Sequence, residues 1–315
     1  KTVSGLMNDK PCKRNIYGNY GIRPERRTRT RYIDRQYLDQ TNHATSSFYT
    51  EHSISEARPL THLATIGMAY DPDKNNSFGI SGNYSNRDQV KNDVVNKFFY
   101  DKNHLQTGNN DRLRYDPEFE KSKDATAFWE HNFPGEDHSL RIEFNISSSK
   151  EQEDNHYQNA YRFPSVYTTF DNTLIRQGDD QQQLTIDYTH MLSESSKLEA
   201  GYSGSFTQLD KNFYGEYYDT AQQKFIKDLV KSNQFLYNEY IHAFYATYQQ
   251  SYEKFGYELG VRAEPVSISG KLVTKDSAIS NAYFKVFPTI HLSYKIKNSE
   301  LQLNYSKRVN RAEGD

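Results

Sequence analysis

The sequence of 315 residues has a single cysteine, Cys12, and therefore no disulfide framework and no cysteine-based metal site. It also lacks an apolar run of about 18 residues, which excludes a transmembrane helix. Membrane-spanning strands are not excluded, because each needs only about ten residues of alternating polarity. The formal net charge is only −2, so the chain has no overall attraction to nucleic acid, and we expect no nucleic-acid partner.

Catalytic and cofactor-binding motifs are missing as well. The sequence contains no G-x-S-x-G, no H-E-x-x-H and no glycine-rich phosphate loop. Its ten histidines are scattered without the spacing of metal ligands. The sequence therefore predicts a protein that is not an enzyme, with no cofactor and no metal site.

The composition is unusual for a soluble domain of this length. Hydrophobic residues make up 35% of the chain, whereas aromatic residues reach 14%, with 26 tyrosines and 18 phenylalanines. Mean hydropathy is −0.95. Such a chain is too polar for a large dry core and too aromatic for disorder. A wide β-barrel with a wet interior, an apolar outer band and aromatic girdles fits this composition.

The stretch Tyr283–Arg311 shows a pattern that recurs through the chain. Apolar and polar residues alternate on both sides of the polar turn Lys297–Glu300, as expected for two amphipathic strands. The same alternation occurs at 16–22, 66–84, 125–146, 184–189, 198–207 and 255–264. The pattern predicts an all-β fold, an antiparallel up-and-down transmembrane β-barrel, of which this chain supplies about eleven strands.

The connections between these strands fall into two kinds. Short polar turns are expected at 71–76, 134–138, 193–197, 251–254 and 297–300. Long irregular loops are expected near 36–60, 101–118, 158–177, 219–232 and 273–282. Short periplasmic turns opposite long extracellular loops are typical of outer-membrane barrels. The sequence therefore predicts that the short turns face the periplasm.

A soluble β-sandwich or barrel would also show alternation. However, Lys197–Leu209 and Lys254–Val266 alternate for about a dozen residues, longer than the usual five or six of soluble strands. Their apolar faces mix small residues such as Ala200 and Gly204 with aromatic ones, which suits a surface that meets lipid. This comparison favours the membrane barrel.

Several segments resemble a known family. They are the G-x-R-x-E of Gly260–Glu264, the F-P-x-x-x-L-x-Y of Phe287–Tyr294 and the L-x-Y-S-x-R-x-N-R of Leu303–Arg311. Together they resemble the outer membrane β-barrel family of TonB-dependent receptor-like proteins of Bacteroidetes-type bacteria, most clearly over 180–311. The resemblance implies a barrel of about 22 strands with an N-terminal plug domain, energised through TonB. We expect residues 1–315 to be one partial barrel domain without the plug, excerpted from a longer protein.

Two sets of charged residues are candidates for the barrel interior. Arg27, Arg29 and Arg31 share one parity and would line one face, either as a basic patch for anionic substrate or lipopolysaccharide phosphates or as a solvated lumen face. Glu258, Arg262 and Glu264 lie on the polar face of one strand. They are candidates for a charge ladder across the lumen that stiffens the barrel or holds the plug.

Aromatic residues near strand ends have two possible roles. Phe213, Tyr214, Tyr217 and Tyr218 stand at the outer end of a long strand, where they are candidates for ligand contact. An aromatic girdle at the membrane interface is expected to include Trp129, Tyr257, Tyr294 and Tyr305.

The resemblance and the patterns together favour the barrel part of an outer-membrane TonB-dependent receptor-like protein of a Gram-negative cell. It would bind or import a nutrient such as a metal chelate, glycan or peptide, with outer-membrane lipid around it and the TonB system reached only through the plug. Two alternatives remain open. One is an outer-membrane structural or adhesive barrel without transport, and the other is a soluble secreted β protein that binds glycans.

Overall fold

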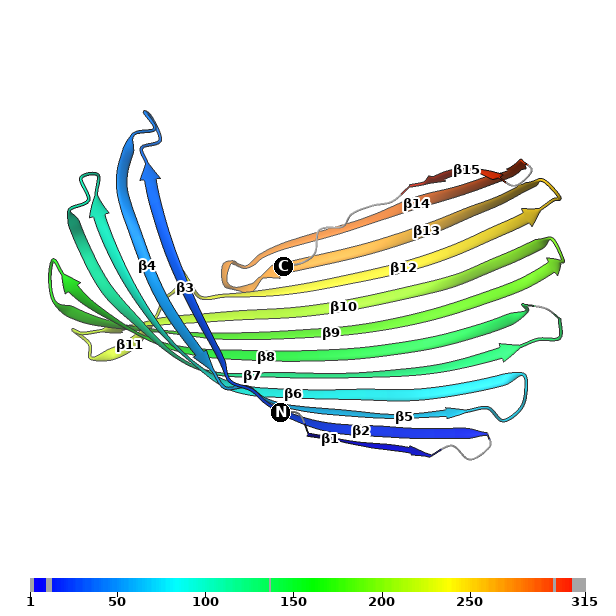
Figure 1. The fold of residues 1–315 in the computed structure, drawn as a ribbon, viewed down its shortest axis with the longest axis horizontal. Helices are drawn as coiled ribbons and strands as arrows, with labels where there is room; N and C mark the ends of the chain where they lie inside the picture. The colour runs from blue at the N-terminus through cyan, green and yellow to red at the C-terminus, as the bar shows by residue number, and fades with distance from the viewer. Residues whose placement is uncertain (1–2, 10–12, 136, 297–298, 308–315) are drawn as a thin grey trace.

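The computed structural model describes residues 3–9, 13–135, 137–296 and 299–307. These residues form one antiparallel sheet of 15 strands and one 3-10 helix (Figure 1). Cys12, residues 297–298 of the last turn and residues 308–311 of the family-like motif lie outside the described residues. The elements are β1 (Val3–Asp9), β2 (Arg14–Pro24), β3 (Arg27–Leu38), β4 (Thr45–Ala57), β5 (Leu60–Tyr70), β6 (Asn76–Asp101), β7 (Gln106–Asn132), β8 (Ser139–Phe163), β9 (Tyr167–Ser193), β10 (Ser196–Asp219), β11 (Lys224–Lys227), β12 (Asn233–Ser251), β13 (Phe255–Leu272), η1 (Val273–Lys275), β14 (Ser277–Ile296) and β15 (Ser299–Ser306).

Two of the long strands are interrupted at the same level. β2 and β3 form one interrupted strand, and β4 and β5 form another. The register between these two strands is the same on both sides of the interruption, and β4 and β5 also share one register with β6. With these segments joined and the short β11 set aside, twelve strands follow one another from β1 to β15. The alternation predicts about eleven strands and misses β1. In the described residues β1 is not paired with β15, so the sheet curves without closing (Figure 1).

The connections expected to be long irregular loops are largely β-strand, and this expectation was wrong. The segment 101–118 lies mostly in β7, and 158–177 is divided between β8 and β9. Residues 36–60 contain all of β4, residues 219–232 contain β11, and β14 begins within 273–282. These segments carry no unbroken run of apolar residues on either face, so the alternation that marks an amphipathic strand is weak, whereas their backbone groups still pair along the ladder.

One face of the sheet carries a continuous apolar band next to the short turns. The strand register places apolar positions of neighbouring strands opposite one another, so the band crosses the sheet without a break. We call this the outer face. One row across it consists of Met68, Ile80, Ala127, Phe144 and Leu184.

The height of the apolar band matches a membrane. On β10 it runs from Leu198 to Phe206, and beyond it the outward positions are polar, beginning with Gln208. About nine residues at about 3.3 Å each, tilted by about 40°, span roughly 20–25 Å. Ile66 is 69% exposed and Phe244 55% exposed within the chain, so these side chains face the surroundings. The predicted assignment of the apolar arms to lipid therefore agrees with the fold.

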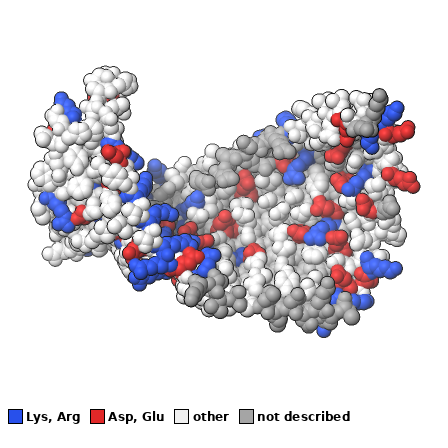
Figure 2. All heavy atoms as spheres, viewed as in Figure 1, with Lys and Arg blue, Asp and Glu red and all other residues white. Residues whose placement is uncertain are grey.

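The opposite, inner face is polar and crowded. The buried acidic side chains Asp116, Glu118 and Glu264 all lie on it. In Figure 2, acidic and basic side chains are interspersed over this face, and lysines and arginines concentrate where the sheet bends. No helix in the described part of the chain is long and apolar enough to cross a membrane.

The sheet bends where prolines interrupt the hydrogen-bond ladder. Pro59 is fully buried in the gap between β4 and β5, and Pro117 lies opposite Val90 on β6. Proline has no N–H to donate, so a ladder breaks or bulges at such a residue. Figure 1 shows β6 and β7 changing direction at this level, where β3 and β4 turn away from the rest. The bend separates the half that carries the continuous apolar band from a second half, whose outer face mixes polar residues with exposed apolar ones such as Val94 and Leu113.

Candidate functional site

The polar half beyond the bend contains a ladder of charged side chains on its inner face. Because the ladder follows the register, each member lies opposite the next, on seven strand segments that neighbour one another in the sheet. Its row consists of Arg29, Ser55, Asp93, Arg114, Tyr157, Asp171 and Tyr217. The row brings the predicted Arg29 and Tyr217 onto one surface with charged residues that were not predicted.

Two arginines of β7 form ion pairs with the acidic residues of this row. Nη2 of Arg114 lies 2.6 Å from Oδ2 of Asp93, and Nη2 of Arg112 lies 2.9 Å from Oδ2 of Asp171. The Arg112 guanidinium also lies over the ring of Tyr157, 3.7 Å from its centroid. Ion pairs of this kind, partly shielded from water, hold planar guanidinium groups in fixed positions.

A second cluster lies on the same face at the bend. Glu118, whose side chain is only 1% exposed, accepts a hydrogen bond of 2.6 Å from the Gln89 amide and pairs with Arg87 at 3.2 Å. Lys91 pairs with Glu118 as well, and its Nζ lies 3.9 Å from Oδ2 of Asp116. A buried carboxylate is stable only with such partners, so the cluster holds the inner face of the bend together.

Asp116 also repairs the ladder that Pro117 interrupts. Its Oδ1 accepts a hydrogen bond of 3.2 Å from the backbone N–H of Asp154 on β8. The side chain is completely buried, and burial raises the pKa of Asp116 although Arg114 and Lys91 oppose that rise. A carboxylate thus takes the place of a backbone carbonyl at the point where β7 and β8 separate.

Glu151 on β8 lies in a concentration of negative charge on the same face. Burial, followed by the neighbouring carboxylates of Glu118, Glu153 and Glu120, raises the pKa of Glu151. The described residues contain no group of three or more acidic, histidine or cysteine side chains arranged to hold a metal ion. The contacts that the described charged residues of the inner face make are ion pairs and hydrogen bonds.

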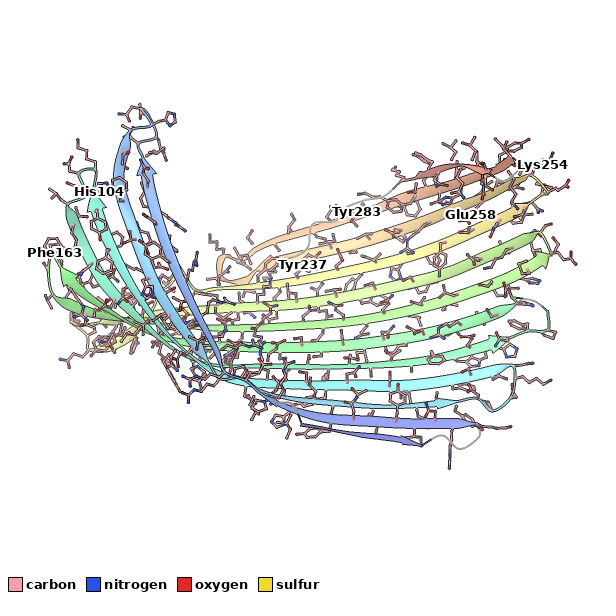
Figure 3. All side chains as sticks on the ribbon, viewed as in Figure 1. His104, Phe163, Tyr237, Lys254, Glu258 and Tyr283 are labelled. Carbon is pink, nitrogen blue, oxygen red and sulfur yellow. The ribbon has the colours of Figure 1, made fainter. Side chains whose placement is uncertain are left out.

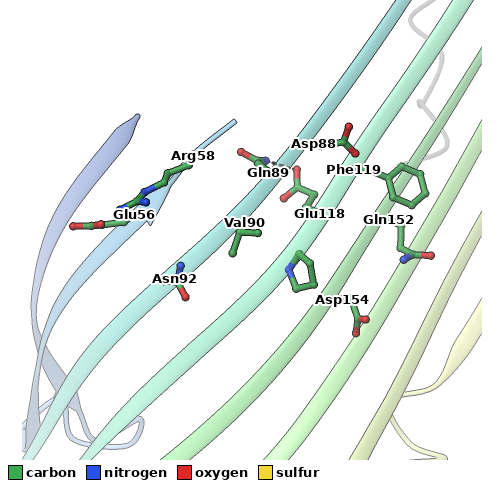
Figure 4. Close-up of a pocket in the computed structure, with 11 residues that line it drawn as sticks. Glu56, Arg58, Asp88, Gln89, Val90, Asn92, Glu118, Phe119, Gln152 and Asp154 are labelled. Carbon is green, nitrogen blue, oxygen red and sulfur yellow. Dashed lines mark hydrogen bonds between the residues drawn. The ribbon is translucent and has the colours of Figure 1, made fainter. Parts of the chain in front are cut away.

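The bend also forms a cavity of about 750 Å³ between Arg58 and strands β6, β7 and β8 (Figure 4). Val90, Pro117 and Phe119 supply apolar lining, and Gln152 supplies a polar side chain. Because of their parity, most of the lining residues belong to the outer face. The cavity is thus adjacent to the charged cluster but opens on the other side of the sheet.

The predicted arginines lie on the inner face, in line with the cluster. Arg27 is opposite Ala57, which is opposite Lys91, and its Nη2 lies 2.5 Å from Oε2 of Glu25. Arg29 and Arg31 are exposed, and neither forms an ion pair with another described residue. Of the three predicted arginines, only Arg27 has an acidic partner among the described residues.

The predicted aromatic ligand contacts do not share one surface. Phe213 and Tyr217 have the parity of the inner face, whereas Tyr214 and Tyr218 have that of the outer face. Phe213 and Tyr214 line a cavity of about 470 Å³ beside Lys227, whose Nζ lies 5.7 Å from the centroid of the Tyr214 ring. Consecutive residues of a strand point to opposite faces, so closeness in sequence does not place all four side chains on one face.

The second predicted charged set forms part of a ladder within the membrane-spanning half. Nε of Arg262 lies 2.6 Å from Oε1 of the buried Glu264. Glu258 stands apart, nearer the short turn that contains Lys254 (Figure 3). The row through Arg262 continues across the sheet as Tyr245, Gly201, Asp187, Arg141 and Glu130.

A glycine makes one contact of this ladder possible. The Tyr245 hydroxyl donates to the Asp187 carboxylate across the intervening strand, and Gly201 lies beneath it. A Cβ at position 201 would lie 2.4 Å from the Tyr245 ring. The absence of a side chain at Gly201 therefore lets a polar contact span three strands.

Three of the four predicted girdle residues lie near the short turns on the outer face, namely Trp129, Tyr257 and Tyr294. Tyr305 is opposite Ile290, farther from the turn, within the apolar band. The predicted girdle does not include the histidines that lie near the short turns. The His138 ring stacks on that of His190 with centroids 3.9 Å apart, and its Nε2 lies 3.0 Å from the Tyr188 hydroxyl.

The charged cluster of β7 escaped prediction although its signal is present in the sequence. Arg112, Arg114, Asp116, Glu118 and Glu120 occupy every second position, which is the period of a strand. The prediction searched for alternation between apolar and polar residues and assigned most of this segment to a loop. Alternation of charge would have placed these side chains on one face.

Comparison with known proteins places this chain among outer-membrane β-barrels. The model of a family described as "Outer membrane protein beta-barrel family" matches residues 131–315. No curated protein sequence matches significantly. The ferric citrate transporter FecA, in its unliganded crystal structure, aligns with 96% of this chain at a TM-score of 0.50 and 11% identity. The outer membrane protease OmpT from Escherichia coli aligns with 89% of the chain and 96% of its own length, at a TM-score of 0.24 and 11% identity. The chain spans 43% of the length of FecA.

Proposed function

Because its model matches more than half of the residues, the chain belongs to the outer membrane protein beta-barrel family, and we propose that it forms part of a barrel that binds a nutrient outside the cell and imports it. The protein resides in the outer membrane of a Gram-negative cell. In this proposal residues 1–315 are one partial barrel domain, a TonB-dependent plug lies elsewhere in the protein, and the chain itself carries no catalytic role.

One observation supports this function above the others. The inner face stays charged from the membrane-spanning half past the bend, so a polar wall continues from the lumen into the long strands. The strand tips at His104 and Phe163 lie at the end opposite the short turns (Figure 3). With the short turns in the periplasm, this wall becomes an extracellular vestibule that leads into the barrel.

The free cations of the vestibule indicate which ligands it would admit. Arg29 and Arg31 project from β3 onto the inner face without an acidic partner among the described residues. Guanidinium groups bind carboxylates and phosphates in a bidentate manner. An anionic nutrient, such as a chelate with free carboxylates or an acidic glycan or peptide, is therefore the substrate class that we propose.

Gene replacement in the source bacterium tests this function. The gene is deleted and restored with the intact coding sequence, as wild type or as an Arg29→Gln/Arg31→Gln variant. Growth is then measured on ferric citrate, acidic oligosaccharides or acidic peptides as the limiting nutrient. We expect deletion to slow growth on one of these nutrients, and the variant to restore less than half of the wild-type rate. A Lys74→Gln/Lys254→Gln control, at the short turns, should restore growth fully.

Uptake and adhesion separate transport from the alternative. Accumulation of the nutrient should stop when a protonophore dissipates the proton-motive force that energises TonB. If deletion leaves growth on all three nutrients unchanged and instead reduces attachment of cells to a surface, the barrel is structural or adhesive, and the transport proposal is wrong.

A further inference from the structure

We propose that the outer face binds phosphate groups of outer-leaflet lipid through the paired side chains of Lys121 and Lys150, with Lys123 and Arg176 beside them. We call these four residues the lysine site. The proposal rests on the orientation given above, with the long strands outside the cell, but it does not depend on whether the barrel transports a nutrient.

The lysine site lies at the height of lipid headgroups. On β7 the apolar band ends at Ala125, and the next outward residues are Lys123 and Lys121; on β8 it ends at Ile146, followed by Ser148 and Lys150. Successive outward positions are about 6.6 Å apart along a strand, so the ammonium groups stand just beyond the hydrocarbon boundary. Phosphate groups of the outer leaflet occupy the same layer.

The register places like charges directly opposite each other. Lys121 is the cross-strand partner of Lys150, at a position where Cβ atoms are about 4.5–5.5 Å apart. Both side chains are exposed. Two unneutralised ammonium groups in this arrangement repel each other, and an anion bound between them would remove that repulsion.

Acidic residues nearby do not neutralise the site. Asp88, Asp180 and Asp210 lie on the same face, and each is diagonal to one basic residue of the site rather than directly opposite it. Asp88 instead accepts a hydrogen bond of 2.5 Å from the Asn86 amide. No ion pair in the described part of the chain involves any residue of the lysine site.

Lysines at a membrane boundary also occur singly, because their long side chains reach toward water. Simple snorkelling does not explain the lysine site, since the charge is confined to neighbouring strands. At the first outward position past the apolar band, β10 has Gln208, β12 has Asn238 and β13 has Ser267. The local concentration of charge on β7–β9 is what a phosphorylated headgroup would recognise.

The cavity at the bend gives the rest of a headgroup room. Phe119 and Gln152, which line it, are the next outward residues after Lys121 and Lys150 on their strands. They form the row immediately beyond the lysine pair. A sugar attached to the phosphate could therefore enter this cavity of about 750 Å³ without displacing the charged contact.

Lipid retention by the full-length protein tests the proposal. The protein is inserted into vesicles containing either bisphosphorylated lipid A or the same lipid without phosphates, extracted in mild detergent and weighed by native mass spectrometry. We expect wild type to retain the phosphorylated lipid at least fivefold more often. A Lys121→Gln/Lys150→Gln variant should lose this preference, whereas Lys121→Arg/Lys150→Arg should keep it. A Lys102→Gln/Lys224→Gln control, at the strand tips, should behave as wild type.

Each outcome decides the question. Equal retention of the two lipids by wild type would overturn the proposal even if the glutamine variant failed to insert. Displacement of the lipid by millimolar inorganic phosphate would show that the site binds free phosphate and not a lipid headgroup, which also overturns it. If the wild-type protein prefers the phosphorylated lipid but imports none of the nutrients, only the proposed function is contradicted.

Discussion

The carboxylate of Asp116 accepts a hydrogen bond from the backbone N–H of Asp154, 3.2 Å away, where Pro117 breaks the ladder between β7 and β8. This contact joins the membrane-spanning half of the sheet to the half beyond the bend. Because Asp116 also faces Arg114 and Lys91, the same side chain couples the backbone at the bend to the charged wall of the inner face.

Asp116→Ala should loosen the bend. The change leaves a backbone donor and two cations without this partner. We expect the free energy needed to open the β7–β8 pairing to fall by about 2–4 kcal/mol. Hydrogen exchange of the full-length protein, followed by mass spectrometry, measures that protection. Asp116→Asn keeps an acceptor oxygen and should lose less. The prediction is wrong if the alanine variant exchanges no faster than Asp180→Ala, a control on the outer face.

Stability should depend on pH through Glu151. The pKa of Glu151 in the folded state is raised above the ordinary 4.5. The contribution of this side chain to the free energy of unfolding is therefore fully present below pH 4.5, and it is lost as the pH rises through the raised pKa. Glu151→Gln removes the unfavourable charge and should stabilise the protein by about 0.5–1 kcal/mol at pH 7. Urea unfolding in lipid vesicles at several pH values should show the difference closing below pH of about 4. A Glu194→Gln control in the short turn should give no such trend.

Gly201→Ala should separate Tyr245 from Asp187. The added Cβ would lie 2.4 Å from the tyrosine ring, so the ring must move and the contact across the strand is lost. Overpacking of this kind costs about 1–3 kcal/mol in the free energy of unfolding, which urea titration measures. Gly178→Ala is a matched control, because no atom lies within 4 Å of a Cβ at that position. Equal destabilisation by both changes would contradict the role assigned to Gly201.

The apolar band should reject charge at its centre more than at its edge. Phe244→Arg places a guanidinium on the lipid-facing surface and should reduce the free energy of unfolding from vesicles by about 2–4 kcal/mol. Asn238→Arg, outward on the same strand but beyond the band, should cost about 0–1 kcal/mol. Similar losses at both positions would mean that the band does not meet hydrocarbon.

Much of the membrane-spanning half could be predicted from the sequence. The alternation around Leu198, Tyr202 and Phe206 predicts both strand and face, because lipid on one side and water on the other impose period two on the side chains. The half beyond the bend could not be recognised in this way. Its outward positions mix polar and apolar residues, as Asn92, Val94 and Asn96 do, so no continuous apolar face marks these strands, although the charges from Arg112 to Glu120 still repeat at every second residue.

The sequence by itself determined the strand segments of the membrane, the short turns and the face of each strand that meets lipid, since these follow from local periodicity and turn chemistry. Only the tertiary structure decided which residues meet across strands. Register placed Lys121 opposite Lys150 and Arg29 in line with Asp93 and Arg114, residues far apart in the chain. Backbone hydrogen bonds between strands set that register, and the two prolines set where the sheet bends, so the charged ladders emerge only when the strands are paired.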